Sequence, residues 1–284
     1  MKRLLDVLQA STDYLAGKGV DHPRLQAEQL MSHTLKCPRL QLYVKFESIL
    51  GEQDLAPLRA GIRRLGAGEP LQYVLGDTEF MGRRFKVDRR ALIPRGDTET
   101  LVEKVLACGP LWALIRPAVA DVGTGSGCVV ISLAVARPEA AYIAIDASEA
   151  ALELARENAT LNAAGGIEFR AGNLLAALPP SSLDAVVANL PYISTDGCRN
   201  LPRHIREHEP LPALDGGVDG LDLIRHLMEE AWERLRPAGW LFLEIGFDQG
   251  ASVVEFLGRR GYAQAAVFQD LGGRDRVVQA CKPA

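Results

Sequence analysis

The feature that most constrains the fold of this 284-residue chain is a regular alternation of short apolar segments and helical stretches after Pro94. Parallel strands need long crossover connections, usually helices, so this alternation predicts an α/β fold: a parallel sheet with helices on both faces. The last two apolar segments have no useful helix between them, which predicts an antiparallel hairpin at one sheet edge. The expected strands are 118–122, 141–145, 167–170, 184–188, 240–245, 264–269 and 276–281, and the expected helices are 97–108, 126–136, 148–162, 220–235 and 248–260.

The first 76 residues have a different pattern. Their apolar residues recur at helical spacing, and no strand pattern interrupts them, so we expect a small helical domain. Residues 77–93 contain short β-type segments on either side of Met81-Gly82, which predicts a β-hairpin linker. The chain is therefore expected to divide into residues 1–76, 77–93 and 94–284.

Composition narrows the possible partners. The formal net charge is −4, so the chain lacks the basic footprint usual in proteins that grip long nucleic acids. The five cysteines form no CxxC pair, which argues against a zinc site or a disulfide framework and favours a reducing cytoplasm. The N-terminus becomes polar too early for a signal peptide, and no run approaches the length of a membrane span. We expect a cytoplasmic monomer with no metal, no membrane contact and no nucleic-acid partner.

A glycine-rich loop follows the first expected strand of the sheet. Asp121 and Val122 lead into Gly123-Thr124-Gly125-Ser126-Gly127, and a helix is expected from about Cys128. Glycines at alternate positions allow a sharp turn and a close approach to a ligand, and a helix N-terminus offers unpaired N–H groups. The dinucleotide fingerprint requires its third glycine where Cys128 stands, and no Walker lysine follows. The loop therefore predicts a nucleotide-type cofactor, with a tight structural turn as the alternative.

Polar residues follow the next two expected strands. Asp146, followed by Ala147, ends the second, and its carboxylate could accept hydrogen bonds from both ribose hydroxyls of an adenosyl group. Asn173 and Leu174 follow the third, where a polar side chain could read the adenine edge. The alternative for Asp146 is a helix N-cap, for which Ser148 is the better candidate. Because the carboxyl ends of parallel strands share one edge, these residues and the glycine loop should face one ligand.

The segment Asn189-Leu190-Pro191-Tyr192 ends the fourth expected strand. A carboxamide or aromatic amino nitrogen is planar and poorly nucleophilic, so two acceptors in its plane would hold both N–H groups. The Asn189 side-chain oxygen and a backbone carbonyl, that of Leu190, could do so, while Pro191 stiffens the loop and Tyr192 packs over the planar group. Catalysis would then be mostly positioning, without a strong base. The alternative is a strand end followed by a proline turn.

Three further segments carry a resemblance to a known family. They are 68–76 (GEPLQYVLG), 92–99 (LIPRGDTE) and 209–221 (EPLPALDGGVDGL). Together with the glycine loop and residues 189–192, they make the chain similar over nearly its whole length to the release-factor glutamine methyltransferase family, also called HemK or PrmC. Segments 92–99 and 209–221 are more diagnostic than the glycine loop, which any class I methyltransferase can share.

The resemblance implies a fold, an activity and a site. The fold is the Rossmann-like seven-stranded sheet of class I methyltransferases, with the N-terminal helical domain recognising substrate. The activity is methyl transfer from S-adenosyl-L-methionine, giving S-adenosyl-L-homocysteine, to the side-chain nitrogen (N5) of the glutamine in the Gly-Gly-Gln loop of peptide-chain release factors. The implied cofactor residues are Asp121, Gly123, Thr124, Gly125, Ser126, Gly127, Asp146, Ala147, Asn173, Leu174 and Asn189, and the implied glutamine-binding residues are Asn189, Leu190, Pro191 and Tyr192, with Arg95 and Glu99.

Three residues or pairs depart from the family pattern. Leu190 stands where the family usually has the first proline of NPPY, and the resulting Asn-Leu-Pro-Tyr is similar to the motif of ribosomal-RNA adenine dimethyltransferases. Asn173 replaces the usual acid, and Gly96-Asp97 replace Pro-Glu. The alternatives are therefore an N6-adenine methyltransferase on RNA or DNA, a glutamine methyltransferase on a ribosomal protein, and a degenerate fold kept as a binding module. Thr98-Glu99 favours the release-factor branch. His204 and His208 are four residues apart, but their charged neighbours indicate a solvated or partner-facing segment rather than a metal site.

Overall fold

The computed structural model describes residues 2–284, and the chain forms two compact units. The first comprises the residues up to 77 together with 202–208, and the second comprises 78–201 and 209–284. The inclusion of 202–208 in the first unit is a long-range feature that the sequence pattern did not indicate. No helix within residues 2–284 is both long enough and apolar enough to cross a membrane.

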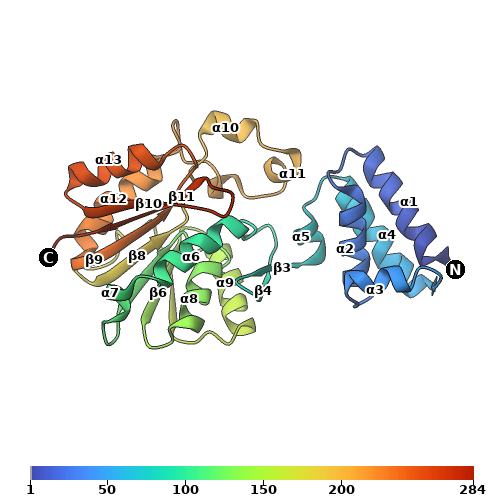
Figure 1. Ribbon diagram of the computed structural model, residues 1–284, viewed down its shortest axis with the longest axis horizontal. Helices are drawn as coiled ribbons and strands as arrows, with labels where there is room; N and C mark the ends of the chain where they lie inside the picture. The colour runs from blue at the N-terminus through green and yellow to red at the C-terminus, as the bar shows by residue number, and fades with distance from the viewer. Residues whose placement is uncertain (1) are drawn as a thin grey trace. The chain divides into compact units, whose positions relative to one another are not determined.

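The first unit is helical, as its apolar spacing predicts (Figure 1). Its helices are α1 (Leu4–Gly17), α2 (Pro23–Thr34), α3 (Arg39–Val44), α4 (Glu52–Gly66), α5 (Leu71–Leu75) and α11 (Arg203–Arg206). Helices α1 to α5 pack around buried side chains such as Leu8, Leu30 and Leu58. One detail differs from the prediction of an all-helical segment: β1 (Lys2–Arg3) pairs antiparallel with β2 (Ile49–Leu50).

The second unit contains the predicted seven-stranded sheet. Its order is β10-β11-β9-β8-β5-β6-β7, and β11 is antiparallel to both of its neighbours. The expected antiparallel hairpin at one edge, β10–β11, is thus confirmed. The strands are β5 (Ala118–Val122), β6 (Ala141–Asp146), β7 (Ile167–Ala171), β8 (Leu183–Ala188), β9 (Leu235–Glu244), β10 (Ala263–Gln269) and β11 (Asp275–Cys281). Strand β9 begins earlier than expected, through an irregular stretch at which its register with β8 shifts.

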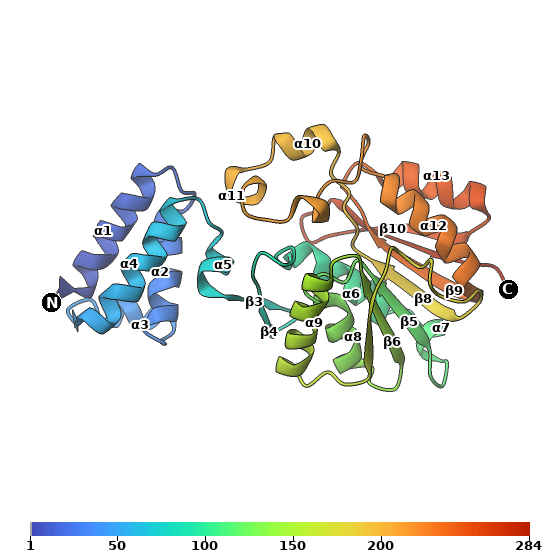
Figure 2. The same cartoon turned by 180° about the vertical axis from the view of Figure 1, so that it is seen from behind.

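Helices cover both faces of this sheet (Figure 2). The helices of this unit are α6 (Glu99–Leu106), α7 (Gly109–Trp112), α8 (Cys128–Ala136), α9 (Glu149–Leu161), α10 (Thr195–Arg199), α12 (Asp222–Arg234) and α13 (Gly250–Arg260), with 3-10 turns η1 (Gly96–Thr98) and η2 (Leu211–Ala213), and α10 lies in a loop apart from the sheet. The predicted helix 97–108 is split, because η1 precedes α6. Side chains alternate between the two faces: Phe242 packs in the core with α6, α7 and α8, and Leu241 packs in the core with α12 and α13.

The predicted hairpin is formed by β3 (Asp77–Phe80) and β4 (Arg83–Lys86). Met81 and Gly82 both have positive φ, 50° and 67°, as the tight turn requires. Phe80 and Phe85 meet edge to face and are buried in the core with α6 and α8. The hairpin is therefore tied to the sheet unit by two aromatic side chains.

Candidate functional site

A cavity of about 450 Å³ opens where β5, β6 and β8 end. Parallel strands present their carboxyl ends at one edge, so residues distant in sequence converge there. The sequence-predicted residues that line the cavity are Arg95, Asp121, Gly123, Thr124, Gly125, Ser126, Asp146, Ala147, Asn173, Leu174, Asn189, Leu190 and Pro191. The cavity therefore collects residues predicted for cofactor and for acceptor in one space.

The glycine loop is closed by its own backbone and by the adjacent strand. The Gly123 and Thr124 amides donate to the Ile145 carbonyl at 2.8 and 3.0 Å, and the Gly127 amide donates to the Thr124 carbonyl at 2.8 Å. Gly123, Gly125 and Gly127 all have positive φ (72°, 54° and 80°), which a side chain would strain. The loop is thus preformed in the conformation that the glycine pattern predicts.

The last glycine of the loop, Gly127, lies outside the cavity lining. A Cβ there would lie 2.8 Å from Ile131 and 3.1 Å from Ala155. It therefore allows α8 and α9 to pack closely. Gly123 has a related role, because a Cβ at this position would lie 2.9 Å from the Leu190 side chain. Leu190, which is 4% exposed, packs directly against the loop.

Asp146 joins the glycine loop to the start of α9. Its Oδ2 accepts from the Gly125 amide at 2.8 Å, and its Oδ1 accepts from the Ser148 amide at 2.9 Å. Each carboxylate oxygen keeps a second lone pair, which could bind a ribose hydroxyl at the cavity wall. Ser148 caps α9 by accepting from Ala151, as expected. Asn173 follows β7 and lines the same cavity.

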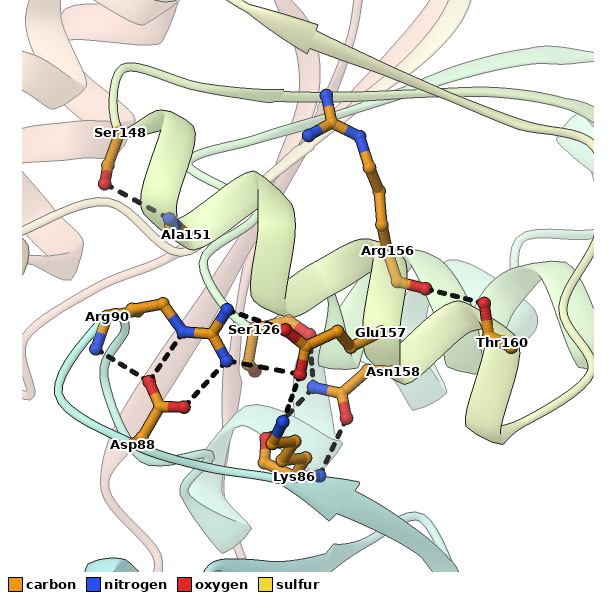
Figure 3. A network of polar contacts seen from close by, with 10 residues as sticks. All are labelled: Lys86, Asp88, Arg90, Ser126, Ser148, Ala151, Arg156, Glu157, Asn158 and Thr160. Atoms are coloured by element: carbon orange, nitrogen blue, oxygen red, sulfur yellow. Dashed lines mark hydrogen bonds and ion pairs between the residues drawn. The ribbon is translucent and has the colours of Figure 1, made fainter.

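A polar network supports the other side of the loop (Figure 3). Asn158 on α9 is fully buried; its Nδ2 donates to the Ser126 carbonyl at 2.9 Å, and its Oδ1 accepts from the Lys86 amide at 2.7 Å. Arg90, which lines the cavity, pairs with Asp88 and with Glu157, and these two carboxylates raise the pKa of its guanidinium. The hairpin strand β4 is thereby linked to both α9 and the glycine loop.

The carboxylates beside the loop make the cavity suitable for a cationic ligand. Burial raises the pKa of Asp121 to about 7, whereas the Thr124 hydroxyl (2.6 Å) and the Val130 amide lower it and the nearby Asp146 raises it further. Asp121 also anchors the start of α8 through Val130. Asp121, the glycine loop and the N-terminus of α8 fit the charged methionine part of an adenosyl-methionine ligand, and Asp146 is left for the ribose hydroxyls.

The acceptor segment is held at its first residue by Thr98. The Asn189 Nδ2 donates to the Thr98 hydroxyl at 3.1 Å. This bond occupies the donor end of the carboxamide and leaves Oδ1 as an acceptor. Thr98 and Asn189 both line the cavity. This geometry suits the prediction that the Asn189 oxygen accepts a hydrogen bond from the substrate amide. That role stays a prediction.

The glycines of segment 209–221 support the same loop from behind. A Cβ at Gly216 would lie 2.5 Å from the Pro191 carbonyl, and one at Gly220 would lie 2.2 Å from the Tyr192 carbonyl. Gln249 donates to the Tyr192 carbonyl at 2.9 Å. Only glycine permits the approach at these two points, which gives a physical reason for the glycines in this segment.

Two predicted glutamine-binding residues lie elsewhere. Tyr192 lines a neighbouring hollow instead of the cavity, and its hydroxyl lies 3.3 Å from Glu244 Oε1 and 3.5 Å from Arg276. The packing of its ring over the acceptor stays a prediction. Glu99 accepts from the Met81 amide at 2.6 Å and so fastens the hairpin turn.

Arg95 lies at the cavity wall and pairs with Glu209, whose side chain is fully buried. Glu209 also accepts from the Ile93 amide at 3.2 Å, so it joins segment 92–99 to segment 209–221. Sequence analysis did not assign roles to Thr98, Glu209, Glu244 or Gln249. The first two lie in the motifs quoted above, and Glu244 is detectable as a lone carboxylate at the end of an apolar strand.

No group of three or more His, Cys, Asp or Glu side chains within residues 2–284 is placed to hold a metal ion. His204 lies on the short helix α11, next to the Arg203–Glu207 ion pair. All five cysteines are free and buried.

Comparison with known proteins connects both units to one family. Residues 6–76 match the model described as PrmC N-terminal domain, and residues 98–201 match the methyltransferase small domain. A release factor glutamine methyltransferase of Geobacter sulfurreducens is 42% identical over 272 residues, covering 96% of this chain and 94% of that protein. The protein of the same name from Moorella thermoacetica is 45% identical over 273 residues, covering 94% of each. A methyltransferase structure from Pyrococcus furiosus, 16% identical with a TM-score of 0.50, covers 72% of this chain and 91% of its own, and shows the fold alone.

Proposed function

The chain belongs to the release factor glutamine methyltransferase family, and on that premise we propose that it methylates the side-chain amide nitrogen (N5) of a glutamine in peptide-chain release factors. The acceptor is the glutamine of the Gly-Gly-Gln loop, and the donor is S-adenosylmethionine. The relatives that span nearly the whole chain favour glutamine over adenine as acceptor.

The observation that most supports this proposal is the fixed orientation of the Asn189 carboxamide. Because its nitrogen donates to Thr98, its oxygen is available to accept one N–H of a substrate amide. A backbone carbonyl in segment 189–191 would accept the other. Both N–H groups held in one plane would direct the nitrogen lone pair out of that plane.

The protein contributes mainly positioning. S-adenosylmethionine supplies an electrophilic methyl carbon on a sulfonium sulfur. Leu190 packs against Gly123, so the acceptor segment and the glycine loop are in direct contact. This contact sets the distance between the two halves of the site. No general base is needed before transfer, because the amide nitrogen becomes acidic only as the new bond forms, and accurate placement can supply much of the rate enhancement.

The cofactor-binding residues are proposed by their position. Asp146 would accept from the ribose hydroxyls, Asn173 and Leu174 would flank the adenine, and residues 123–126 would surround the methionine part. Asn173 carries both a donor and an acceptor, so it can still pair with the adenine edge in place of the usual acid.

We propose that the helical unit 1–76 recognises the release factor. Its support is a groove of about 540 Å³ between α1 and α4, with apolar residues such as Val7 and Leu58 beside Arg59 and Arg63. Such a mixed surface suits a protein partner. We further propose that the chain acts as a monomer in the cytoplasm, where its free cysteines stay reduced.

The test is methyl transfer from labelled S-adenosylmethionine to purified release factor. We expect label in the wild-type factor and none in a factor whose Gly-Gly-Gln glutamine is replaced by alanine. Ribosomal RNA and ribosomal proteins serve as parallel acceptors. Label that persists in the alanine control would refute the substrate assignment, and stronger labelling of RNA would favour the adenine alternative.

A further inference from the structure

A buried arginine of the edge hairpin lies beside the acceptor segment. Arg276 is on strand β11 and is 6% exposed. An arginine is almost never buried to this extent unless it is paired, and its five N–H donors need acceptors in a fixed geometry. Arg276 lines the same hollow as Tyr192. The partners of its guanidinium therefore show which parts of the site it joins.

Two groups fix the guanidinium itself. Its Nε donates to Asp270 Oδ2 at 3.1 Å, and its Nη1 donates to the Ile245 carbonyl at 3.3 Å. The other oxygen of Asp270 accepts from the Gly272 and Arg274 amides at 2.8 and 3.1 Å, so the hairpin turn holds this carboxylate. The guanidinium is thus set in place by the end of β9 and by the turn between β10 and β11.

The same guanidinium reaches groups at both ends of the acceptor segment. At one end, Nη2 pairs with Asp97 at 3.3 Å. Asp97 lies in η1 directly before Thr98, whose hydroxyl accepts from Asn189. At the other end, Nη1 donates to the Tyr192 hydroxyl at 3.5 Å. Arg276 therefore joins the turn that holds the first residue of the segment to the side chain of the last.

The Tyr192 hydroxyl has a defined direction in this arrangement. A guanidinium only donates, so the phenol oxygen accepts from Arg276. The hydroxyl hydrogen then points to Glu244 Oε1, which accepts it at 3.3 Å. Gln249 holds the backbone carbonyl of the same tyrosine at 2.9 Å. Tyr192 is thus fixed at its hydroxyl and at its backbone.

We propose that Arg276 is a positioning residue for methyl transfer, which fixes the acceptor segment by holding η1 and the Tyr192 hydroxyl in one frame. The inference rests on the proposed function, because it assumes that segment 189–192 binds the substrate amide. Arg276 lies outside the cavity lining and acts through Asp97 and Tyr192. The role requires the planar fork of a guanidinium, since the ammonium group of a lysine cannot serve several acceptors in one plane.

Arg276→Met tests this role kinetically. It removes all the donors, so we expect kcat to fall about 10- to 100-fold, as for a misplaced acceptor, while the cofactor Kd stays within severalfold. Arg276→Lys should remain slow because it lacks the fork. Arg236→Met is the matched control: it breaks another arginine–carboxylate pair of the sheet, that of Arg236 with Asp184 at 2.6 Å, and should keep the wild-type kcat.

Asp97 tests the bridge at an exposed position, since its side chain is 57% exposed. Asp97→Ala should lower kcat severalfold. Asp97→Glu should restore most of it, because it keeps the carboxylate and is the usual residue of the family at this position. These variants leave Arg276 in place, so they test the bridge even if Arg276→Met folds poorly.

Tyr192→Phe removes the contact at the other end. If Arg276 acts through the Tyr192 hydroxyl, Tyr192→Phe combined with Arg276→Met should be hardly slower than Arg276→Met alone. Losses of the two single variants that multiply in the double variant would contradict this contact.

A second readout does not depend on turnover. The side-chain NH₂ signals of Asn189 and the ring signal of ¹³C-labelled Tyr192 are assigned by their loss in Asn189→Ala and Tyr192→Phe. Both should shift in Arg276→Met and neither in Arg236→Met. Unshifted signals or an unchanged kcat in Arg276→Met, or a loss of kcat matched by an equal loss of cofactor affinity, would overturn the positioning role and leave the proposed function intact. If the wild-type protein fails to methylate glutamine, the proposed function fails, and the signals still decide whether Arg276 fixes the segment.

Discussion

The two loops of the site are stabilised in opposite ways. The glycine loop, residues 123–127, is fixed by its own backbone, by the neighbouring Ile145 carbonyl and by Asp146. The acceptor segment, residues 189–192, is fixed by groups far away in sequence, among them Thr98, Gly216 and Gln249. The first is held chiefly by backbone hydrogen bonds between neighbouring strand ends, and the second is held by side chains and glycines from several more distant segments.

This difference has a functional consequence. A loop held by backbone hydrogen bonds between adjacent strands should shift less than a segment held by side chains, and shifts of that segment are transmitted to the acceptor nitrogen. We therefore expect cofactor affinity and turnover to respond to different residues.

Asn189→Ala should give the largest separation of the two properties. It removes the acceptor that orients the substrate amide, so we expect kcat to fall by about 1,000-fold or more. The affinity for S-adenosylmethionine, measured by calorimetry, should stay within severalfold of the wild type. Turnover close to that of the wild type would contradict the role given to Asn189.

Gly216→Ala should displace the acceptor segment without touching the cofactor. Its new Cβ would lie 2.5 Å from the Pro191 carbonyl, so the segment must shift. We expect kcat to fall about 100-fold, as for an ångström-scale misplacement. Gly258→Ala, where nothing lies within 4 Å, is the matched control. Equal kinetics for the two variants would show that the remote support is unimportant.

Gly125→Ala should affect the other loop. The position has φ of 54° but no neighbour closer than 3.8 Å, so the cost is backbone strain of about 1–3 kcal/mol. We expect the cofactor Kd to rise about tenfold and kcat at saturating cofactor to change little. A lower kcat with unchanged Kd would mean that the two loops are not separable in this way.

The smallest expected effect concerns the network in Figure 3. Hydrogen bonds from Arg90 and Lys86 lower the pKa of Glu157 from 4.5 to about 2. A carboxyl whose pKa is lower in the folded state stabilises the fold above pH 4.5, and this contribution is lost as the pH falls towards 2. Because Glu157 is 41% exposed, screening limits the contribution to about 1 kcal/mol or less. Urea unfolding of Glu157→Gln should show this deficit at pH 7 and a smaller one at pH 3; a deficit that does not shrink would point to packing.

The same contrast explains what could be predicted from the sequence. The sheet, its edge hairpin and the cavity-lining residues at the ends of β5, β6 and β8 follow from strand periodicity and from the rule that strand ends converge. Gly127 and Tyr192 did not follow, because their surroundings are formed by α9 and by Glu244 and Arg276. The pattern of neighbouring residues indicates that a residue belongs to a functional loop. The direction of its side chain depends on partners that are distant in sequence and come close only in the fold.

The most direct test of the account is to locate the transferred methyl group by mass spectrometry of a release factor treated with this protein. We predict one added methyl group on the glutamine of the Gly-Gly-Gln loop with the wild-type protein, and none with Asn189→Ala under the same conditions. A methyl group on another residue, or unchanged glutamine methylation by Asn189→Ala, would contradict the account.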